Sequence, residues 1–471
     1  MSILEDDVMT AIRNVCILLF LVVSLAISGD MQVLTLDSSL DLALENNPDY
    51  KMAERELKKA DAGVWEAYST IMPQINANAS VQHAWDIQTQ TIPNFIKLML
   101  PPELGGLIPE FANMPDYIDI AFGLENTFVY GANLQQPLFL GGAGVAGIKI
   151  AYAAKRASRQ NLIATKQQLI YNTVDAFYAC ILAQDIINVQ EEALAQAEAN
   201  FNVVSKKYDV GSASGFDKMR SQVEVANIKP QVISTRNQLN SALTRLRTVL
   251  GLPRDAQIGI EGDLVYMYDD FGSKTLDEIQ QLALQSRPEL LAMREQKYIS
   301  QKGITLARSN FMPKVVFQTD YSFLAFRNDY HIAQDDFSKG FTSSISLQVP
   351  LFTGFKNAKS YQKARLDYKI MLDTDKQVTD GIMAEVEIAY NTFKEAEEKY
   401  AAASQSVDLA KEALRLANMM YTEGANTQLD VLNSQLALTQ SRLNYVTSVY
   451  EYQMASYRLR KVTGTLEGLL K

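Results

Sequence analysis

The sequence contains few of the residues from which enzymes and metal sites are built. Its 471 residues include two histidines, His83 and His331, and two cysteines, Cys16 and Cys180. Such a set holds neither the ligands of a metal centre nor the parts of a catalytic triad, and no glycine-rich phosphate-binding motif follows a predicted strand. We therefore expect no enzyme activity, no metal site and no cofactor.

Basic clusters are missing as well. The chain has 44 lysines and arginines against 54 aspartates and glutamates, a formal net charge of -10. No basic stripe offsets this balance, whereas contacts to nucleic-acid phosphates need clustered lysine and arginine. We therefore exclude a nucleic-acid partner.

Long hydrophobic runs are confined to the N-terminus. An apolar run from Val15 to Val23 precedes Ala26-Ile27-Ser28, which has the small-residue spacing of a signal-peptidase site. The run is shorter than the roughly 20 residues that a transmembrane helix requires. We predict a signal peptide at residues 1–28 and hence export. The mature chain then keeps only Cys180 and can form no internal disulfide.

What the chain does have is a tandem duplication. A stretch from Leu36-Asp37 to Met72-Pro73 recurs from Leu276-Asp277 to Met312-Pro313, and the spacing from Leu134 to Gly251 recurs from Leu347 to Gly464. Proline and glycine are sparse, at 13 and 23 residues, which favours long helices within each copy. Each copy is therefore one supersecondary unit repeated along the chain.

Each copy is predicted to contain a β-hairpin. Between Gln74 and Trp85 apolar residues alternate with polar ones, and the same period of two returns in three later segments. We place the hairpins at about residues 74–138 and 314–350. The alternation fits a half-buried soluble sheet as well as a barrel with lipid outside and water inside.

A long helical hairpin follows each β-hairpin. Helical periodicity runs without a break from about Val145 to Tyr208 and from about Lys356 to Tyr421, which is about 65 residues or roughly 100 Å of helix each. An apolar stripe padded with alanine favours coiled-coil packing of these helices. Pro230 is expected to kink the first returning helix.

These elements predict the order of the domains. Residues 29–255 form the first repeat, with its helical hairpin at about 143–250. Residues 256–273 are a linker between the repeats. Residues 274–471 form the second repeat, with its helical hairpin at about 356–463.

The number of strands bears on the oligomeric state. Four strands cannot close a barrel, and an open edge facing lipid would leave its amides unpaired. Two chains would give eight strands, whose interior fills with side chains, whereas three give twelve and leave room for solute. We predict an α+β membrane protein: a homotrimer whose 12-stranded outer-membrane β-barrel, with four strands per chain, continues into a long periplasmic α-helical coiled-coil barrel. The alternative is a periplasmic coiled-coil structural or scaffolding protein with a soluble sheet, which would extract without detergent.

Short motifs recur at equivalent places in both copies. They are Tyr208-x-x-Gly211 and Tyr421-x-x-Gly424, followed by Asp217 and Asp430, and the copy ends Arg245-Leu-Arg-x-x-x-Gly251 and Arg458-Leu-Arg-x-x-x-Gly464. In their order and duplicated spacing, these motifs resemble the TolC-like outer-membrane efflux factors over about residues 34–466.

The resemblance implies a function. The chain would be the outer-membrane exit channel of a tripartite efflux pump or a type I secretion system, passively conducting its cargo. The implied partners are a periplasmic adaptor (membrane fusion protein), an inner-membrane transporter of the RND, ABC or MFS type, and outer-membrane lipid. Drugs, metals and proteins remain alternative cargoes, because an exit duct does not choose what it carries.

The resemblance also implies a periplasmic gate. Asp430 matches an aspartate that forms a ring at the closed end, Tyr421 matches a tyrosine whose hydrogen bonding ties neighbouring coils shut, and Asp217 is the first-copy counterpart of Asp430. Asn426 and Asn433 stand where some members have an arginine and a second aspartate, so we expect a less acidic and more weakly latched gate. On sequence alone, Asp217 and Asp430 are helix N-terminal caps that follow a glycine turn.

The turns between the long helices resemble the surface that family members present to adaptors. Small residues there would let another coiled coil approach closely. The residues concerned are Val210, Gly211, Ser212, Glu423, Gly424 and Ala425. On sequence alone, the two glycines are helix C-caps.

Residues 86–121 have no counterpart in the second copy. They combine several prolines with apolar residues such as Phe95, Leu98 and Met99. We expect this insertion to pack against the rim of its own barrel, since apolar loop residues are usually buried by neighbours. Folding over the outer mouth and lying on the lipid surface are the alternatives.

Overall fold

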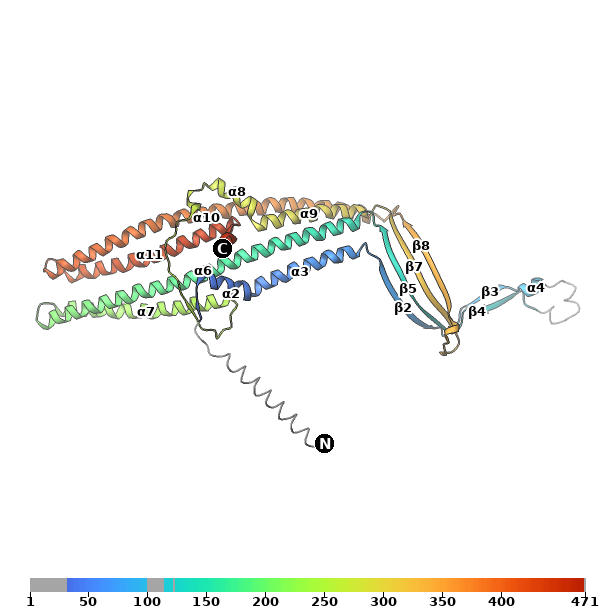
Figure 1. The fold of residues 1–471 in the computed structure, drawn as a ribbon, viewed down its shortest axis with the longest axis horizontal. Helices are drawn as coiled ribbons and strands as arrows, with labels where there is room; N and C mark the ends of the chain where they lie inside the picture. Colours follow the sequence, from blue (N-terminus) through green and yellow to red (C-terminus); the bar gives the residue numbers. More distant parts are fainter. Residues whose placement is uncertain (1–31, 100–113, 122, 470–471) are drawn as a thin grey trace, which may run out of the picture. The chain divides into compact units, whose positions relative to one another are not determined.

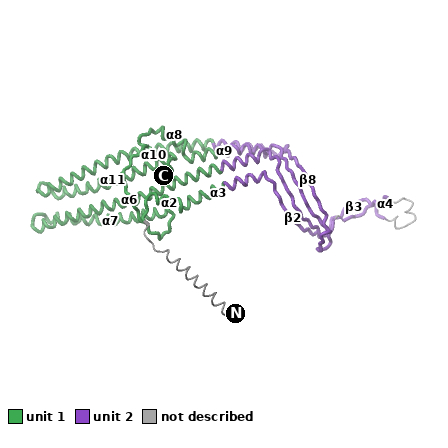
Figure 2. Tube along the Cα trace, in the orientation of Figure 1, with its two compact units in different colours: residues 1–60, 155–297, 372–471 green, residues 61–154, 298–371 purple. Residues whose placement is uncertain are grey.

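The computed structural model describes residues 32–99, 114–121 and 123–469. The predicted signal peptide at residues 1–28 lies outside the described residues, as does the centre of the insertion. The chain divides into two compact units, and each is built from segments of both repeats (Figure 2). Of the described residues, those within 1–60, 155–297 and 372–471 form the first unit, and those within 61–154 and 298–371 form the second.

The second unit contains a four-stranded antiparallel sheet. Its strands are β2 (Gln74–His83), β5 (Asn126–Phe139), β7 (Lys314–Arg327) and β8 (Ser338–Gln348), in the spatial order β2-β5-β7-β8 (Figure 1). The central pair β5 and β7 joins the two repeats, and β2 and β8 form the edges. The fold thus brings two hairpins from distant parts of the chain into one sheet.

The pairing register separates the two faces of this sheet by polarity. Directly paired residues point to the same face, and successive residues point to opposite faces. One row crosses the four strands as Asn76, Asn133, Asp320 and Thr342. The next row, on the opposite face, crosses as Ala77, Ala132, Tyr321 and Phe341.

The apolar face of the sheet is uncovered in the single chain. Ile75 at one edge is 72% exposed, and Phe341 at the other is 73% exposed. Tyr130 and Phe323 stack across the central pair with ring centroids 4.6 Å apart. Such a face needs an apolar environment from outside the chain.

Long helices dominate the rest of the chain. The first repeat contributes α2 (Leu36–Asn46), α3 (Pro48–Ser69), α6 (Ala143–Asp209) and α7 (Gly215–Val249). The second contributes α8 (Leu276–Ser286), α9 (Pro288–Ser309), α10 (Lys356–Thr422) and α11 (Gln428–Val462). Pro48 and Pro288 begin α3 and α9, where a missing N–H costs nothing. Pro230 does not end α7, which continues through it.

Short elements complete the architecture. Strand β1 (Gln32–Leu34) pairs in parallel with β6 (Ile258–Ile260), and this links the start of the first repeat to the inter-repeat segment. Single 3-10 turns lie at η2 (Asp270–Ser273), η3 (Gln334–Asp336) and η4 (Leu466–Leu469). Among the described helices, none has the length and apolar character needed to span a bilayer.

The apolar core of the first unit lies around the middle of the long helices. One buried cluster combines Phe177 and Ile181 of α6 with Leu246 of α7 and Met454 of α11, so it joins the two repeats. A second cluster packs Phe393 of α10 against α8 and α11. Because apolar burial is the main stabilising term, these clusters are the chief connection between the two repeats within the first unit.

The expectation that the insertion packs against the barrel rim is wrong for its described residues. Strands β3 (Thr89–Pro93) and β4 (Tyr117–Ala121) pair only with each other, and α4 (Phe95–Met99) follows β3. Leu98 and Met99 are 77% and 85% exposed. In the described part of the insertion, β3 and β4 form their backbone hydrogen bonds with each other, and Leu98 and Met99 are left uncovered.

Candidate functional site: the tips of the helical hairpins

The two long helical hairpins turn through matched glycine motifs. Between α6 and α7, Ser212 donates its N–H to the Lys207 carbonyl at 2.7 Å and Gly211 donates to the Tyr208 carbonyl at 2.9 Å. Between α10 and α11, the N–H of Ala425 bonds to the Met420 carbonyl at 2.8 Å. Gly211 and Gly424 have φ of 76° and 74°, so both tips use the same left-handed C-cap. We call these turns the first tip and the second tip.

The residues expected to contact an adaptor all lie exposed on these turns. Val210, at 76% exposure, is the largest apolar side chain among them. A side chain built at Gly211 or Gly424 would meet nothing within 4 Å, so it is the backbone conformation, and not crowding, that requires glycine there. The other exposed turn residues are Ser212, Glu423 and Ala425.

Asp217 and Asp430 are not the helix N-caps that the sequence alone predicted: Ser214 and Thr427 are the caps, and each aspartate is the third helical residue of a capping box. Asp430 Oδ2 accepts the N–H of Thr427 at 3.0 Å and its hydroxyl at 2.6 Å, and the Asp430 N–H bonds back to the Thr427 oxygen at 3.3 Å. Asp217 forms the same capping box with Ser214, whose hydroxyl lies 2.7 Å from Asp217 Oδ2. The hydrogen bonds from Thr427 hold the pKa of Asp430 below its ordinary value, which keeps this carboxylate charged.

Tyr421, near the second tip, contacts a residue of the first helical hairpin. The ammonium of Lys207, from α6, lies 4.0 Å from the centroid of the Tyr421 ring on α10. Burial, and next the negative charge of Asp217, raise the pKa of the Tyr421 phenol. Tyr421 also packs against the buried α10–α11 cluster that contains Leu414 and Val431. The structure thus brings Tyr421 and Asp217 together and adds Lys207, a residue that sequence reasoning missed.

The two tips are chemically unequal. Tyr208, the first-repeat counterpart of Tyr421, is covered by Lys218 of its own hairpin, with the ammonium 4.8 Å from the ring centroid. Lys218 also pairs with Asp209 at 3.7 Å. Asn426 lies half-buried in the second turn, and Asn433 is exposed on α11, almost one turn beyond Asp430. The first tip is therefore tied within its own hairpin, and the second is tied to its neighbour.

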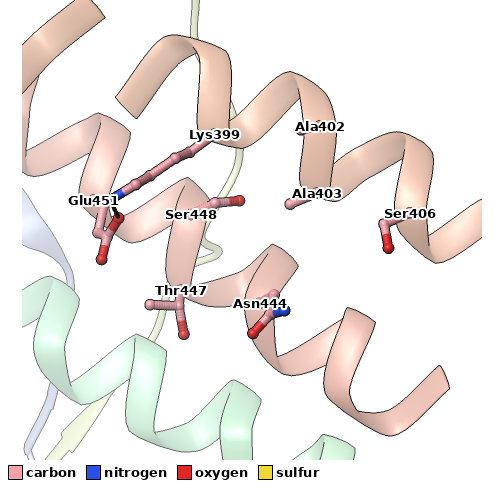
Figure 3. A pocket seen from close by; sticks show the side chains of 8 residues that line it. All are labelled: Lys399, Ala402, Ala403, Ser406, Asn444, Thr447, Ser448 and Glu451. Carbon is pink, nitrogen blue, oxygen red and sulfur yellow. Dashed lines mark ion pairs between the residues drawn. The ribbon is translucent and has the colours of Figure 1, made fainter. Parts of the chain in front are cut away.

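A polar groove lies between α10 and α11. It has a volume of about 470 Å³, and Figure 3 shows Lys399 on α10 reaching across it toward Glu451 on α11. The Lys399 ammonium lies 3.6 Å from Glu451 and 2.8 Å from Glu395, and these carboxylates raise its pKa. Asp430, Asn444 and Glu451 are separated along α11 by multiples of seven residues. Seven residues make about two helical turns, so all three side chains lie along one stripe of the helix.

No metal site is found within the described ranges. No group of three or more histidine, cysteine, aspartate or glutamate side chains there is arranged to hold a metal ion. The arrangement at the tips is instead one of caps, charges and a covered tyrosine.

The fold and the sequence together define the class of the protein. A family model described as "outer membrane efflux protein" matches residues 39–252 and 279–465, one segment for each repeat. The chain therefore belongs to the outer membrane efflux protein family. It is an outer-membrane exit channel, located in the outer membrane, and the family consists of channel proteins rather than enzymes.

Individual relatives are distant and cover nearly the whole chain. The alkaline protease secretion protein AprF of Pseudomonas aeruginosa is 24% identical over 94% of this chain and 87% of its own length. The cobalt-zinc-cadmium resistance protein CzcC of Cupriavidus metallidurans is 20% identical over 92% and 90%. The crystal structure of the CmeC outer membrane channel of Campylobacter jejuni superposes with a TM-score of 0.74 at 19% identity, covering 92% of this chain and 86% of CmeC.

Proposed function

We propose that three copies of this chain close one 12-stranded barrel and continue it into a helical tube. The observation that carries this proposal is the open sheet: among the described strands, β2 pairs only with β5, and β8 only with β7. Backbone groups at both edges would be unpaired in lipid, and joining β2 of one copy to β8 of the next removes both edges. Three such junctions give the barrel diameter that leaves a water-filled interior.

The polarity of the two faces supports the same arrangement. In a closed barrel the face containing Tyr321 and Phe341 would meet lipid, and the face containing Asn76, Asn133 and Asp320 would line the water-filled interior. In the helical tube, the polar stripe of α11 with Asp430, Asn444 and Glu451 would face the interior.

We propose that Asp430 forms the constriction at the periplasmic end, with Asp217 and Tyr421 holding the tips closed. Three Asp430 carboxylates near one axis would repel each other and attract cations. Asn426 and Asn433 carry no charge, so three carboxylates rather than six would stand at this level. The exposed turns at Val210, Gly211 and Ser212 and at Glu423, Gly424 and Ala425 are the proposed contact with a periplasmic adaptor.

The proposed partners follow from the class of the protein. An exit channel without an energy source needs an inner-membrane transporter, of the RND, ABC or MFS type, and a periplasmic adaptor to join the two. The names of the relatives include protease secretion and metal resistance. The proposal covers both kinds of cargo, because an exit duct does not choose what it carries.

Planar-bilayer conductance of an Asp430→Asn variant tests the gate. We expect Asp430→Asn to lower cation selectivity and to weaken block by multivalent cations. Thr427→Ala is the matched control, because it breaks the same capping box and keeps the carboxylate. Equal selectivity in wild type and Asp430→Asn would remove Asp430 from the constriction.

A further inference from the structure

The insertion of the first repeat begins at the end of the sheet that is remote from the long helices. Helices α3 and α6 adjoin β2 and β5 at Gln74 and Phe139, whereas the insertion leaves the same two strands at His83 and Asn126. The second repeat has no counterpart, so each copy of the chain carries one insertion. In an outer-membrane protein, this end of the sheet lies at a boundary between lipid and water.

A bend separates the insertion from the sheet. Beyond the final pair of β2 and β5, Ala84 donates its N–H to the Glu125 carbonyl at 2.7 Å, and strand pairing resumes between Thr89 and Ala121. Gly123 lies in this gap with a φ of 103°, a conformation that favours glycine. The ribbon formed by β3 and β4 therefore need not continue in the direction of the strands of the sheet.

The ribbon separates polar from apolar side chains. Thr91 pairs with Asp119, and the Thr91 hydroxyl donates to the Asp119 carboxylate. The next pair, Ile92 with Ile118, points to the opposite face. A ribbon of this kind can lie with one face on an apolar surface and the other in water.

At its far end the ribbon carries a hydrogen-bonded unit, which we call the α4 cluster. It consists of residues 94–99, which include α4, and residues 114–117. Asn94 is buried; it donates its N–H to the Asp116 carbonyl at 2.9 Å and its side-chain amide to the Pro115 carbonyl at 3.0 Å. These bonds give the cluster a defined shape and satisfy its polar groups internally.

The one charged side chain of α4 turns back toward the ribbon. The Lys97 ammonium donates to the Met114 carbonyl at 2.7 Å and lies 2.8 Å from the Asp116 carboxylate. Lysine often behaves in this way where its stem lies along apolar surface and its charge reaches a polar boundary. The charge of α4 is thus held at the end of the ribbon.

The other side chains of α4 are all apolar and uncovered. Phe95, Ile96, Leu98 and Met99 are each more than half exposed. Phe95, Leu98 and Met99 are three and four residues apart, so they share one side of the helical turn, and Lys97 lies on the other. An apolar side of this kind marks a surface that meets an apolar partner.

Amphipathic aromatic residues lie at both ends of the ribbon. Trp85 precedes β3 and is almost fully exposed, and the His83 ring meets it edge-on with the centroids 4.6 Å apart. Tyr117 is exposed at the other end, where it pairs with Pro93. Exposed tryptophan and tyrosine are typical of the boundary between lipid and water.

We propose that the α4 cluster inserts into the hydrocarbon of the outer leaflet and anchors the outer rim of the channel there. Phe95, Leu98 and Met99 lie among the acyl chains, and the Lys97–Asp116 pair stays at the level of the headgroups. Amphipathic units of this kind enter a membrane by about 5–10 Å. This inference goes beyond the proposed channel function, and it rests on the proposed placement of the sheet in the membrane with the helices on the periplasmic side.

Charge favours lipid over the other copies of the chain as the surface that covers the cluster. In the described part of the insertion, Asp86, Asp116 and Asp119 stand against one basic residue, Lys97. Three insertions meeting above the mouth of the channel would bring these like charges together, and they would repel one another. Three insertions turned outward onto the membrane stay apart. Three such anchors fix the depth and the orientation of one barrel.

The first experiment measures the depth of nitroxide labels on the purified full-length protein in phosphatidylcholine vesicles. Molecular oxygen is concentrated in hydrocarbon, and a nickel chelate stays in water. We expect a label at Leu98→Cys to collide several-fold more with oxygen than with the chelate, as does one at Phe341→Cys on the apolar face of the sheet. Thr89→Cys, exposed on the ribbon, is the reference for water. Cys180 is fully buried and does not take the label.

The reference label separates failure of the anchor from failure of the channel. If the Leu98 label lies in water while the Phe341 label lies in lipid, the anchor is overturned and the channel stands. If both labels lie in water, the placement of the sheet is overturned, and the anchor with it. Strong dipolar broadening among three Leu98 labels would place the insertions over the mouth and would also overturn the anchor.

A second experiment tests the apolar side of α4 with the label kept at Leu98→Cys. Phe95→Gln should lower the ratio of oxygen to chelate collisions several-fold, because a polar amide is costly in hydrocarbon. Phe95→Leu keeps an apolar side chain and should retain the original ratio. Thr89→Gln, which introduces the same amide on the ribbon, is the control. An equal ratio in Phe95→Gln and Thr89→Gln would contradict insertion through this side.

Discussion

Arg460 of α11 holds Asp269 of the inter-repeat segment through two hydrogen bonds, from Nε at 3.0 Å and from Nη2 at 2.7 Å. Asp269 is 5% exposed, also accepts the Ser456 hydroxyl, and caps η2 through the Phe271 N–H at 3.0 Å. The Arg460 guanidinium lies 5.0 Å from the Phe271 ring centroid. This contact ties the segment between the repeats to the last long helix.

Removing the Asp269 carboxylate should destabilise the first unit. Asp269→Ala leaves the Arg460 charge without its partner, and breaking such a buried pair costs about 3 kcal/mol. We expect a clearly lower urea midpoint, followed by helical circular dichroism in detergent. Asp270→Ala is the control, because Asp270 is exposed and contributes only its backbone carbonyl to Ser273. A wild-type midpoint for Asp269→Ala would contradict this account.

The capping box of Asp430 predicts a pH dependence. Hydrogen bonds from Thr427 lower the pKa of Asp430 in the folded state. The stabilisation is therefore complete above the unfolded pKa of about 3.9 and is lost as the pH falls through the lower folded value. Thr427→Ala removes these hydrogen bonds. The melting temperature of this variant should therefore fall less than that of the wild type as the pH is lowered through this acidic range. Thr422→Ala, whose hydroxyl bonds to the Asn418 carbonyl, should keep the wild-type slope.

Two glycines with the same backbone conformation should respond differently to alanine. Gly424 and Gly464 have φ of 74° and 76°, and this left-handed conformation costs alanine about 1–2 kcal/mol at either position. At Gly424 the new Cβ meets open space, whereas at Gly464 it would lie 2.6 Å from the Ser286 carbonyl oxygen. Gly464→Ala should therefore lower the thermal midpoint more than Gly424→Ala. Equal midpoints would mean that the α8 end does not approach Gly464.

Cys180, the one cysteine among the described residues, should be inert while the protein is folded. Cys180 is fully buried in α6, and burial raises the pKa of its thiol to about 12. Because the thiolate is the reactive form, maleimide at neutral pH should label the protein only after denaturation. Rapid labelling of the native protein would place Cys180 at an opening in the core.

Regular features of the fold were predictable because they repeat locally. Unbroken periodicity predicted helices from about Val145 to Tyr208 and from about Lys356 to Tyr421, and α6 and α10 span Ala143–Asp209 and Lys356–Thr422. The alternation at residues 75–81 likewise predicted the apolar face that the pairing with β5 defines. An apolar period of 3.6 residues in a helix, or of 2 residues in a strand, indicates on which face each side chain lies.

The long-range contacts were not predictable in the same way. Lys207 with Tyr421, Glu192 with Arg442, and Asp269 with Arg460 each join residues far apart in the chain. No local period records which residues of two separate helices come to face each other. The comparison with the family was the available signal for the tip. Asn426, where some members have an arginine, predicted a more weakly latched gate, and this stays a prediction. It gave no indication that Lys207 lies over the Tyr421 ring.

The insertion was misjudged for a related reason. Residues 86–121 have no second copy, so nothing in the repeat constrains them. The general rule that apolar loop residues are buried did not hold for Leu98 and Met99, because β3 and β4 satisfy each other and hold these side chains in the open. The rule describes apolar loop residues on average, and it does not predict where a particular segment lies when its strands pair only with each other.

The most direct test of the central claim is the native mass of the detergent-solubilised mature protein. Closing the open edges β2 and β8 into one 12-stranded barrel requires three chains, so we predict a single species of three times the mass of the mature chain. A species containing one or two chains would contradict the shared barrel, and with it the tube and gate that depend on it.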